Sequence, residues 1–181
     1  MNPFTIALVV LISFASSMAV SQDRPDNSAK NREKMLAFKD MVGNWKGDGF
    51  LQKGKDISER SLVDETVQMK LDGMLMVVEG VGKLADGSGK VVHHAFGVLS
   101  YDGLADQYKF RAYLADGRNT DAWFNVIAAN KFQWGFDVPN GKIRYTIIID
   151  PSAKTWNETG EFSRDEKTWF KTFEMNLKRT E

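Results

Sequence analysis

Apolar residues recur at every second position over most of this chain, beginning just after Gly43. Residues 132–138 are the clearest example, because apolar side chains alternate there with Gln133 and Asp137. A period of two places one face of a strand against a core and the other face in water. The pattern is typical of antiparallel sheet with one solvated side, and it argues against a mainly helical fold.

Ten such runs follow one another, joined by short links rich in turn residues, such as Asp72-Gly73 and Asn140-Gly141. Helical spacing precedes them only at residues 30–41, and Gly43 ends that helix. We expect strands at residues 44–53, 59–72, 74–84, 90–101, 106–115, 119–129, 131–138, 142–150, 155–163 and 167–179.

The order of these elements narrows the topology. No helix separates the strands, so parallel arrangements are disfavoured, and hairpin links favour an up-and-down order. Closing the sheet on itself would remove its exposed edges. The sequence therefore predicts an all-β fold, a closed antiparallel up-and-down β-barrel of about ten strands with a short N-terminal helix.

The N-terminus has the features of an export signal. Residues 4–15 are apolar and uncharged but shorter than the roughly 20 residues that span a bilayer. We expect a signal peptide over 1–21, with cleavage after Ala19 or Ser21, a mobile polar lead-in over 22–34 and a barrel domain over 35–181. This predicts a secreted or periplasmic protein with no transmembrane segment after cleavage; an uncleaved anchor is the alternative, because no Lys or Arg precedes the apolar run.

Composition excludes several function classes. Lys and Arg number 24 and Asp and Glu number 24, so the net charge of 0 gives no electrostatic footprint for nucleic acid. The absence of Cys removes disulfides, thiolate metal sites and cysteine nucleophiles. The phosphate-loop, calcium-loop and hydrolase motifs are also missing. We therefore expect no metal and no cofactor, and the oligomeric state stays open.

The segment from Phe38 to Gly47 places a short helix and then Gly43-x-Trp45 at the head of the first strand. It resembles the opening signature of the calycin superfamily, the lipocalins and their barrel relatives. The resemblance implies that Trp45 plugs the closed end and that a basic residue of the last strand packs across its ring. Arg179 is the candidate, since it shares a face with Phe173. The chain looks most like uncharacterised bacterial secreted lipocalin-like families.

A more distant resemblance is to nitrobindin-like proteins, which are ten-stranded calycins with a similar opening. That resemblance implies a haem held by a histidine late in the chain. The only histidines here are His93 and His94, and none follows them. Haem binding is therefore kept as a less favoured alternative.

Three titratable residues fall on otherwise apolar faces. His94 shares its face with Val92 and Phe96, which predicts that it faces the lumen and that His93 faces solvent. Glu65 and Glu79 also alternate with apolar residues. An inward His94 beside Glu65 or Glu79 could act in acid–base catalysis. The favoured explanation is instead a hydrogen-bonded histidine at the core edge and a polar patch at the barrel mouth. We assign no catalytic residue.

Aromatic residues are the remaining functional signal. An aromatic-lined barrel interior suits a small hydrophobic or aromatic ligand. The main hypothesis is a non-catalytic binding protein, and the alternative is a barrel filled by its own side chains that acts through its surface. The predicted lining residues are Trp123, Trp134, Phe136 and Tyr145, with His94 and Arg111 as polar contacts.

Overall fold

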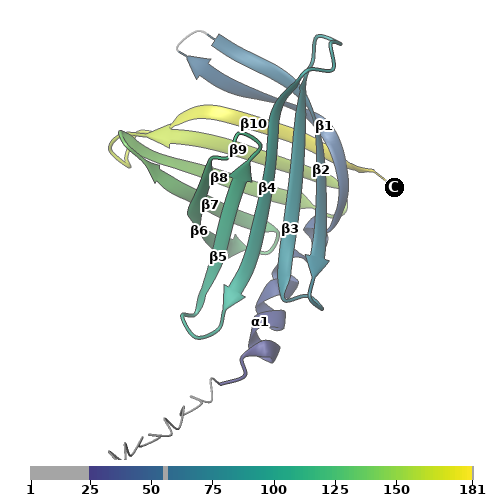
Figure 1. The fold of residues 1–181 in the computed structure, drawn as a ribbon, viewed down its shortest axis with the longest axis vertical. Helices are drawn as coiled ribbons and strands as arrows, with labels where there is room; N and C mark the ends of the chain where they lie inside the picture. The colour runs from purple at the N-terminus through teal and green to yellow at the C-terminus, as the bar shows by residue number, and fades with distance from the viewer. Residues whose placement is uncertain (1–24, 55–56, 181) are drawn as a thin grey trace, which may run out of the picture.

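The computed structural model describes residues 25–54 and 57–180 (Figure 1). It is a closed barrel of ten antiparallel strands, in which each strand pairs with its neighbours in sequence and β1 pairs with β10. The predicted fold class is therefore confirmed, whereas the signal peptide expected over 1–21 lies outside the described residues. The strands are β1 (Gly43–Gly54), β2 (Ile57–Lys70), β3 (Leu75–Leu84), β4 (Val91–Asp102), β5 (Gln107–Leu114), β6 (Asn119–Ala128), β7 (Lys131–Val138), β8 (Gly141–Asp150), β9 (Thr155–Ser163) and β10 (Phe170–Thr180).

The barrel closes through the pairing of its first and last strands. Trp45 of β1 lies opposite Arg179 of β10, and Leu51 lies opposite Phe173 at the other end of the same ladder. β10 also pairs with β9, so neither terminal strand presents an unpaired edge. Closure satisfies the backbone groups that an open sheet would leave exposed.

One helical segment lies at one end of the barrel, where Figure 1 shows α1 beside the ends of β3 and β4. It comprises α1 (Ser28–Met35) and the 3₁₀ helix η1 (Leu36–Met41). The helix begins earlier than residue 30, so the part of the expected mobile lead-in over 28–34 is helical. Polar contacts that no periodicity reveals hold it: Lys30 Nζ lies 2.7 Å from Asp106, and Tyr108 donates a hydrogen bond to the carbonyl of Lys34.

The helical segment fills this end of the barrel. Phe38 of η1 is completely buried and packs edge-on against Tyr108 and Phe124, with its ring centroid 4.9 Å from that of Phe132. Met35 and Met41 are buried beside it. The main core of the protein therefore lies at the helix end of the barrel, which we call the plugged end. No helix within the described ranges is long and apolar enough to cross a membrane.

Candidate functional site

The plugged end is sealed by a contact between Trp45 and Arg179. Trp45 is 1% exposed, and its Nε1 donates a 2.8 Å hydrogen bond to the carbonyl of Met41. The guanidinium of Arg179 lies over the indole, with Cζ 4.2 Å from the ring centroid, and donates to the carbonyls of Asp40 and Val42. This is the arrangement that the calycin resemblance implies, and it fixes the helical segment to the last strand.

Gly43 allows this close approach. Its φ is +137°, and a Cβ built there would lie 2.5 Å from Nη1 of Arg179. A side chain at position 43 would therefore strain the backbone and displace the guanidinium from the Trp45 ring.

Beyond the plug, an aromatic wall lines the interior. Trp134 of β7 and Tyr145 of β8 are directly opposite in register and stack with centroids 4.1 Å apart and planes 12° apart. Phe136 continues the row, 6.2 Å from Trp134. Phe132 and Ile147, two positions back on the same strands, are buried, which fixes this face as the inner one. Yet all three wall residues are only half-buried, so solvent reaches this part of the interior.

Bulky inner-face groups lie flat over glycines of neighbouring strands. A Cβ at Gly80 would lie 2.2 Å from Oε1 of Glu65, and one at Gly97 would lie 2.8 Å from the ring of Phe110. A Cβ at Gly160 would likewise meet the ring of Tyr145 at 2.7 Å. Because these side chains rest against the wall, they project less far across the lumen than their size would allow.

Trp123 does not belong to the aromatic wall. It lies opposite Gly135 on the outer face, where it is 39% exposed, and its ring would be 2.6 Å from a Cβ at Gly135. The next residue, Phe124, is buried and takes the inner position. Two consecutive aromatic residues leave the direction of a strand ambiguous, so the expected inward orientation of Trp123 was wrong.

His94 and Arg111 also lie on the outer face, which corrects their predicted orientation. Leu99 and Tyr101 are buried and set the inner face of β4, so even-numbered residues point outward. The alternation predicted the wrong direction for His94 because Val92, Phe96 and Val98 form a second apolar row, which lies on the outer side of β4. Arg111 pairs with Asp121 at 3.5 Å and lies over the Tyr113 ring.

The predicted histidine–carboxylate pair does form, but outside the barrel. His94 Nε2 lies 3.0 Å from Oε1 of Glu79, and the two side chains are 43% and 53% exposed. His93 faces the interior instead, opposite Gly82, and burial together with the neighbouring His94 lowers its pKa. An acid–base pair of His94 with Glu65 is therefore excluded by the opposite directions of their side chains.

Two carboxyl groups, those of Glu65 and Glu158, face the interior between the plug and the rim. Glu158 of β9 is 7% exposed and accepts a 3.0 Å hydrogen bond from Nε1 of Trp134. Burial raises its pKa to about 7, although the indoles of Trp134 and Trp156 oppose the rise. Burial, together with the charge of Glu158, raises the pKa of Glu65 to about 8. We did not predict Glu158, although Trp156-x-Glu158-x-Gly160 places it on the same face as a core tryptophan.

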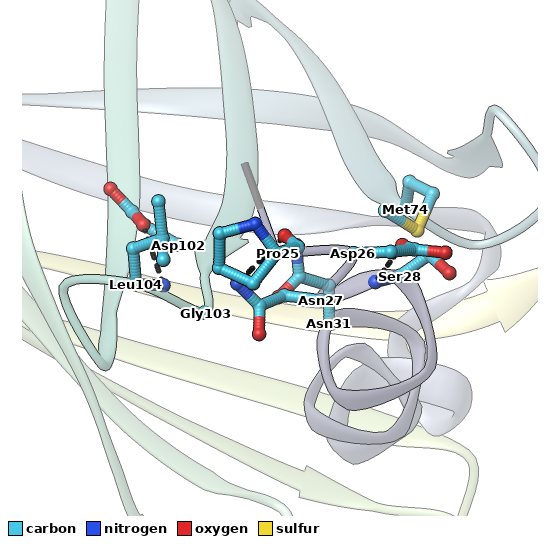
Figure 2. Close-up of a pocket in the computed structure, with 9 residues that line it drawn as sticks. All are labelled: Pro25, Asp26, Asn27, Ser28, Asn31, Met74, Asp102, Gly103 and Leu104. Atoms are coloured by element: carbon cyan, nitrogen blue, oxygen red, sulfur yellow. Dashed lines mark hydrogen bonds between the residues drawn. The ribbon is translucent and has the colours of Figure 1, made fainter. Parts of the chain in front are cut away.

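Two depressions are found, and neither is lined by the stacked Trp134–Tyr145 pair. One of about 500 Å³ is found at the β9–β10 hairpin and is lined by Phe162, Arg164, Asp165, Thr168 and Phe170. Figure 2 shows the other, of about 270 Å³, where the start of α1 meets the β4–β5 turn; its lining residues are Pro25, Asp26, Asn27, Ser28, Asn31, Met74, Asp102, Gly103 and Leu104. Among the described residues, no group of three or more His, Asp or Glu is placed to hold a metal ion.

Comparison with known proteins supports the fold. The sequence matches no family model and no curated protein. The structure is similar to that of Rv2717c from M. tuberculosis, with a TM-score of 0.60 and 10% identity over 81% of this chain and 97% of that one. It is also similar to the S-type phycobiliprotein lyase CPES from Guillardia theta, with a TM-score of 0.56 and 11% identity over 83% and 93% of the two chains.

Both are ten-stranded calycin-like barrels. This chain has a calycin-like fold. At such low identity the likeness extends to the fold alone, and what the barrel does must be argued from its own residues.

Proposed function

We propose that this calycin-like barrel is a secreted or periplasmic protein that binds a small, flat hydrophobic or aromatic molecule in its interior without catalysing a reaction. The observation that carries the proposal is the stacked Trp134–Tyr145 pair, which faces inward above the plug and is only half-buried. Large aromatic rings that face a barrel interior and remain accessible are a surface on which a ligand ring can pack.

The shape of the interior supports this use. The plugged end is filled by Phe38 and its neighbours, whereas the residues beyond Phe132 on β7 are half-buried. Beyond the stacked pair, Phe136 lies opposite Ile143, and Ile143 lies opposite Phe162 on the next strand. Phe162 lines the 500 Å³ depression near the rim. A ligand could therefore enter from the end that the helical segment does not cover.

The alternatives receive less support. A barrel that is filled throughout would bury its inner-face aromatic residues, as it does at Phe132 but not at Trp134 or Tyr145. The His94–Glu79 pair, on which the enzymatic alternative rested, lies on the outer face, away from the aromatic wall.

The proposed secretion or periplasmic location depends on the apolar segment 4–15. It is tested by the mass of the protein recovered from a periplasmic fraction, which shows whether residues 1–21 have been removed.

The test is a fluorescence titration with the neutral, flat probe N-phenyl-1-naphthylamine. We expect binding by the wild type and a loss of about five- to thirtyfold in affinity for Trp134→Leu, equivalent to about 1–2 kcal/mol of ring contact. Trp123→Leu is the matched control, because Trp123 lies on the adjacent strand but on the outer face. Absence of binding, or equal losses in the two variants, would overturn the proposal.

A further inference from the structure

The carboxyl group of Glu65 has no partner in the barrel interior. It lies flat against Gly80, and it makes no hydrogen bond and no ion pair within residues 25–54 and 57–180. The neighbouring inner-face positions of β2, Val63 and Val67, are apolar and buried. A carboxylate in such a place is unfavourable unless a cation or hydrogen-bond donors accompany it.

Within residues 25–54 and 57–180, no inner-face cation is free to pair with Glu65. Arg179, which points inward, already donates to two carbonyl groups and covers Trp45. His93 is nearer the barrel mouth, and its pKa is lowered. On the described strands beyond the plug, the inner face also carries Glu158, Tyr145 and His93. Glu59, nearer the rim of β2, shares that face and is paired with Lys53 at 2.7 Å.

A second buried polar group in the same region is the indole N–H of Trp156. Trp156 is 2% exposed, and its Nε1 forms no well-aligned hydrogen bond, although it lies close enough to Glu158 to lower the pKa of that carboxyl. The indole lies two positions before Glu158 on the inner face of β9, and its influence on the pKa of Glu158 places it beside that carboxyl. A buried donor whose hydrogen bond is poorly aligned leaves room for a water or a ligand to complete it.

The aromatic wall and the carboxyl groups adjoin each other. The ring of Trp134 stacks on Tyr145, and its Nε1 donates a hydrogen bond to Glu158. Trp134 is therefore part of the aromatic wall and also in direct contact with one of the interior carboxyl groups. The charge of Glu158 in turn acts on Glu65. Two strands lie between those of the two acids: β1 presents Gly47 and Gly49 to the interior, and β10 presents Met175 and Leu177. The charge of Glu158 still reaches Glu65 across them.

We propose that the ligand of this barrel is a flat aromatic molecule that carries a protonated nitrogen, with its ring on Trp134 and Tyr145 and its cationic group between Glu65 and Glu158. The proposal rests on the binding function proposed above and names its ligand class. The cation supplies the missing counter-charge of Glu65, and the aromatic faces around it add cation–π attraction.

Binding of such a cation exchanges it for a proton. Near neutral pH the pair of carboxyl groups retains a proton, because both groups are buried and their negative charges repel each other. A cationic ligand beside them favours the ionised form of both. Ligand binding therefore releases a proton to solution, and affinity falls as the pH is lowered from about 8 to about 6.

The test compares two fluorescent probes of the same ring system at about pH 8, the cationic 9-aminoacridine and the neutral acridine. We expect the wild type to bind the cation at least about tenfold more tightly. Glu65→Gln keeps the shape of the side chain and should remove most of that preference while leaving acridine affinity within about twofold. Glu79→Gln, on the outer face, is the matched control and should change neither affinity.

Proton release on binding, measured in weakly buffered wild-type protein, gives a second readout that needs no variant. Release with 9-aminoacridine and none with acridine is expected. If both probes bind with equal affinity and release no proton, the cation proposal is overturned while the binding function stands. If neither probe nor N-phenyl-1-naphthylamine binds, both proposals fall.

Discussion

Trp134 and Glu158 are joined by a 3.0 Å hydrogen bond between the indole Nε1 and carboxyl Oε1, and this bond ties the aromatic wall to the acids of the interior. An indole that stacks on Tyr145 has its N–H direction fixed by that stacking. The bond therefore orients the Glu158 carboxyl as well as stabilising its ionised form.

Removing this donor should raise the pKa of Glu158. Trp134→Phe keeps an aromatic ring beside Tyr145 but deletes the N–H group that favours the carboxylate. We expect the pKa to rise above its value of about 7, as followed by the NMR shift of the labelled glutamate Cδ during a pH titration. Trp123→Phe should leave it in place, and an unchanged pKa in Trp134→Phe would contradict the assignment.

The stability of the empty barrel should decrease as the pH rises. Glu65 and Glu158 ionise near 4.5 when unfolded but near 8 and 7 when folded, so the folded state binds more protons between these values. Their contribution to the free energy of unfolding is fully present below about pH 4.5 and falls as the pH rises to about 8. Above that pH it no longer changes. We expect urea unfolding to show a loss of several kcal/mol between pH 5 and pH 8.5 from these groups.

Glu65→Gln supplies the matching experiment, because its side chain cannot ionise. It should flatten the pH profile and make the protein more stable than the wild type above about pH 8. Glu79→Gln should retain the wild-type slope, since that carboxyl is exposed and paired with His94. A slope that survives in Glu65→Gln and in Glu158→Gln would show that other groups cause it.

The Trp45–Arg179 contact should be a main support of the plugged end. Arg179→Lys keeps the charge but loses the planar group that covers the indole and binds two carbonyls at once. We expect a loss of about 1–3 kcal/mol in the free energy of unfolding in urea. Lys178→Gln, on the outward neighbour, should change it by less than about 0.5 kcal/mol; equal effects would argue against the contact.

Gly97 should control the free width of the lumen. A methyl group there would meet the ring of Phe110 at 2.8 Å and push it away from the wall. We expect Gly97→Ala to weaken N-phenyl-1-naphthylamine binding more than it lowers the Tm. Gly54→Ala is the comparison, because its methyl would meet Ile57 at an ordinary 3.8 Å and lies far from the aromatic wall. Unchanged affinity in Gly97→Ala would place the ligand elsewhere.

Strand alternation and turn chemistry were enough to predict the barrel, because both are local and repeat ten times. Side-chain direction could be predicted only where one face of a strand is clearly more apolar, as at Trp134 and Tyr145. On β4 both faces are apolar, and burial of Leu99 rather than Phe96 decides that His94 points outward.

The polar part of the candidate site was harder to predict for a different reason. Glu158 becomes important only because Trp134, distant in sequence, donates to it, and this partnership depends on how three strands align. The early start of α1 has a similar cause, since its anchors are on the β4–β5 turn and on β5.

The pairing of β1 with β10 also bears on how the chain reaches its native state. The first strand to leave the ribosome must wait for the last before both of its edges are covered, and loops of this length close slowly. Until Arg179 arrives, Trp45 and the backbone of β1 are open to other chains. A chain truncated within β10 would retain β1 to β9 but leave one edge of β1 and one edge of β9 unpaired. We expect such a chain to aggregate rather than to form a smaller barrel.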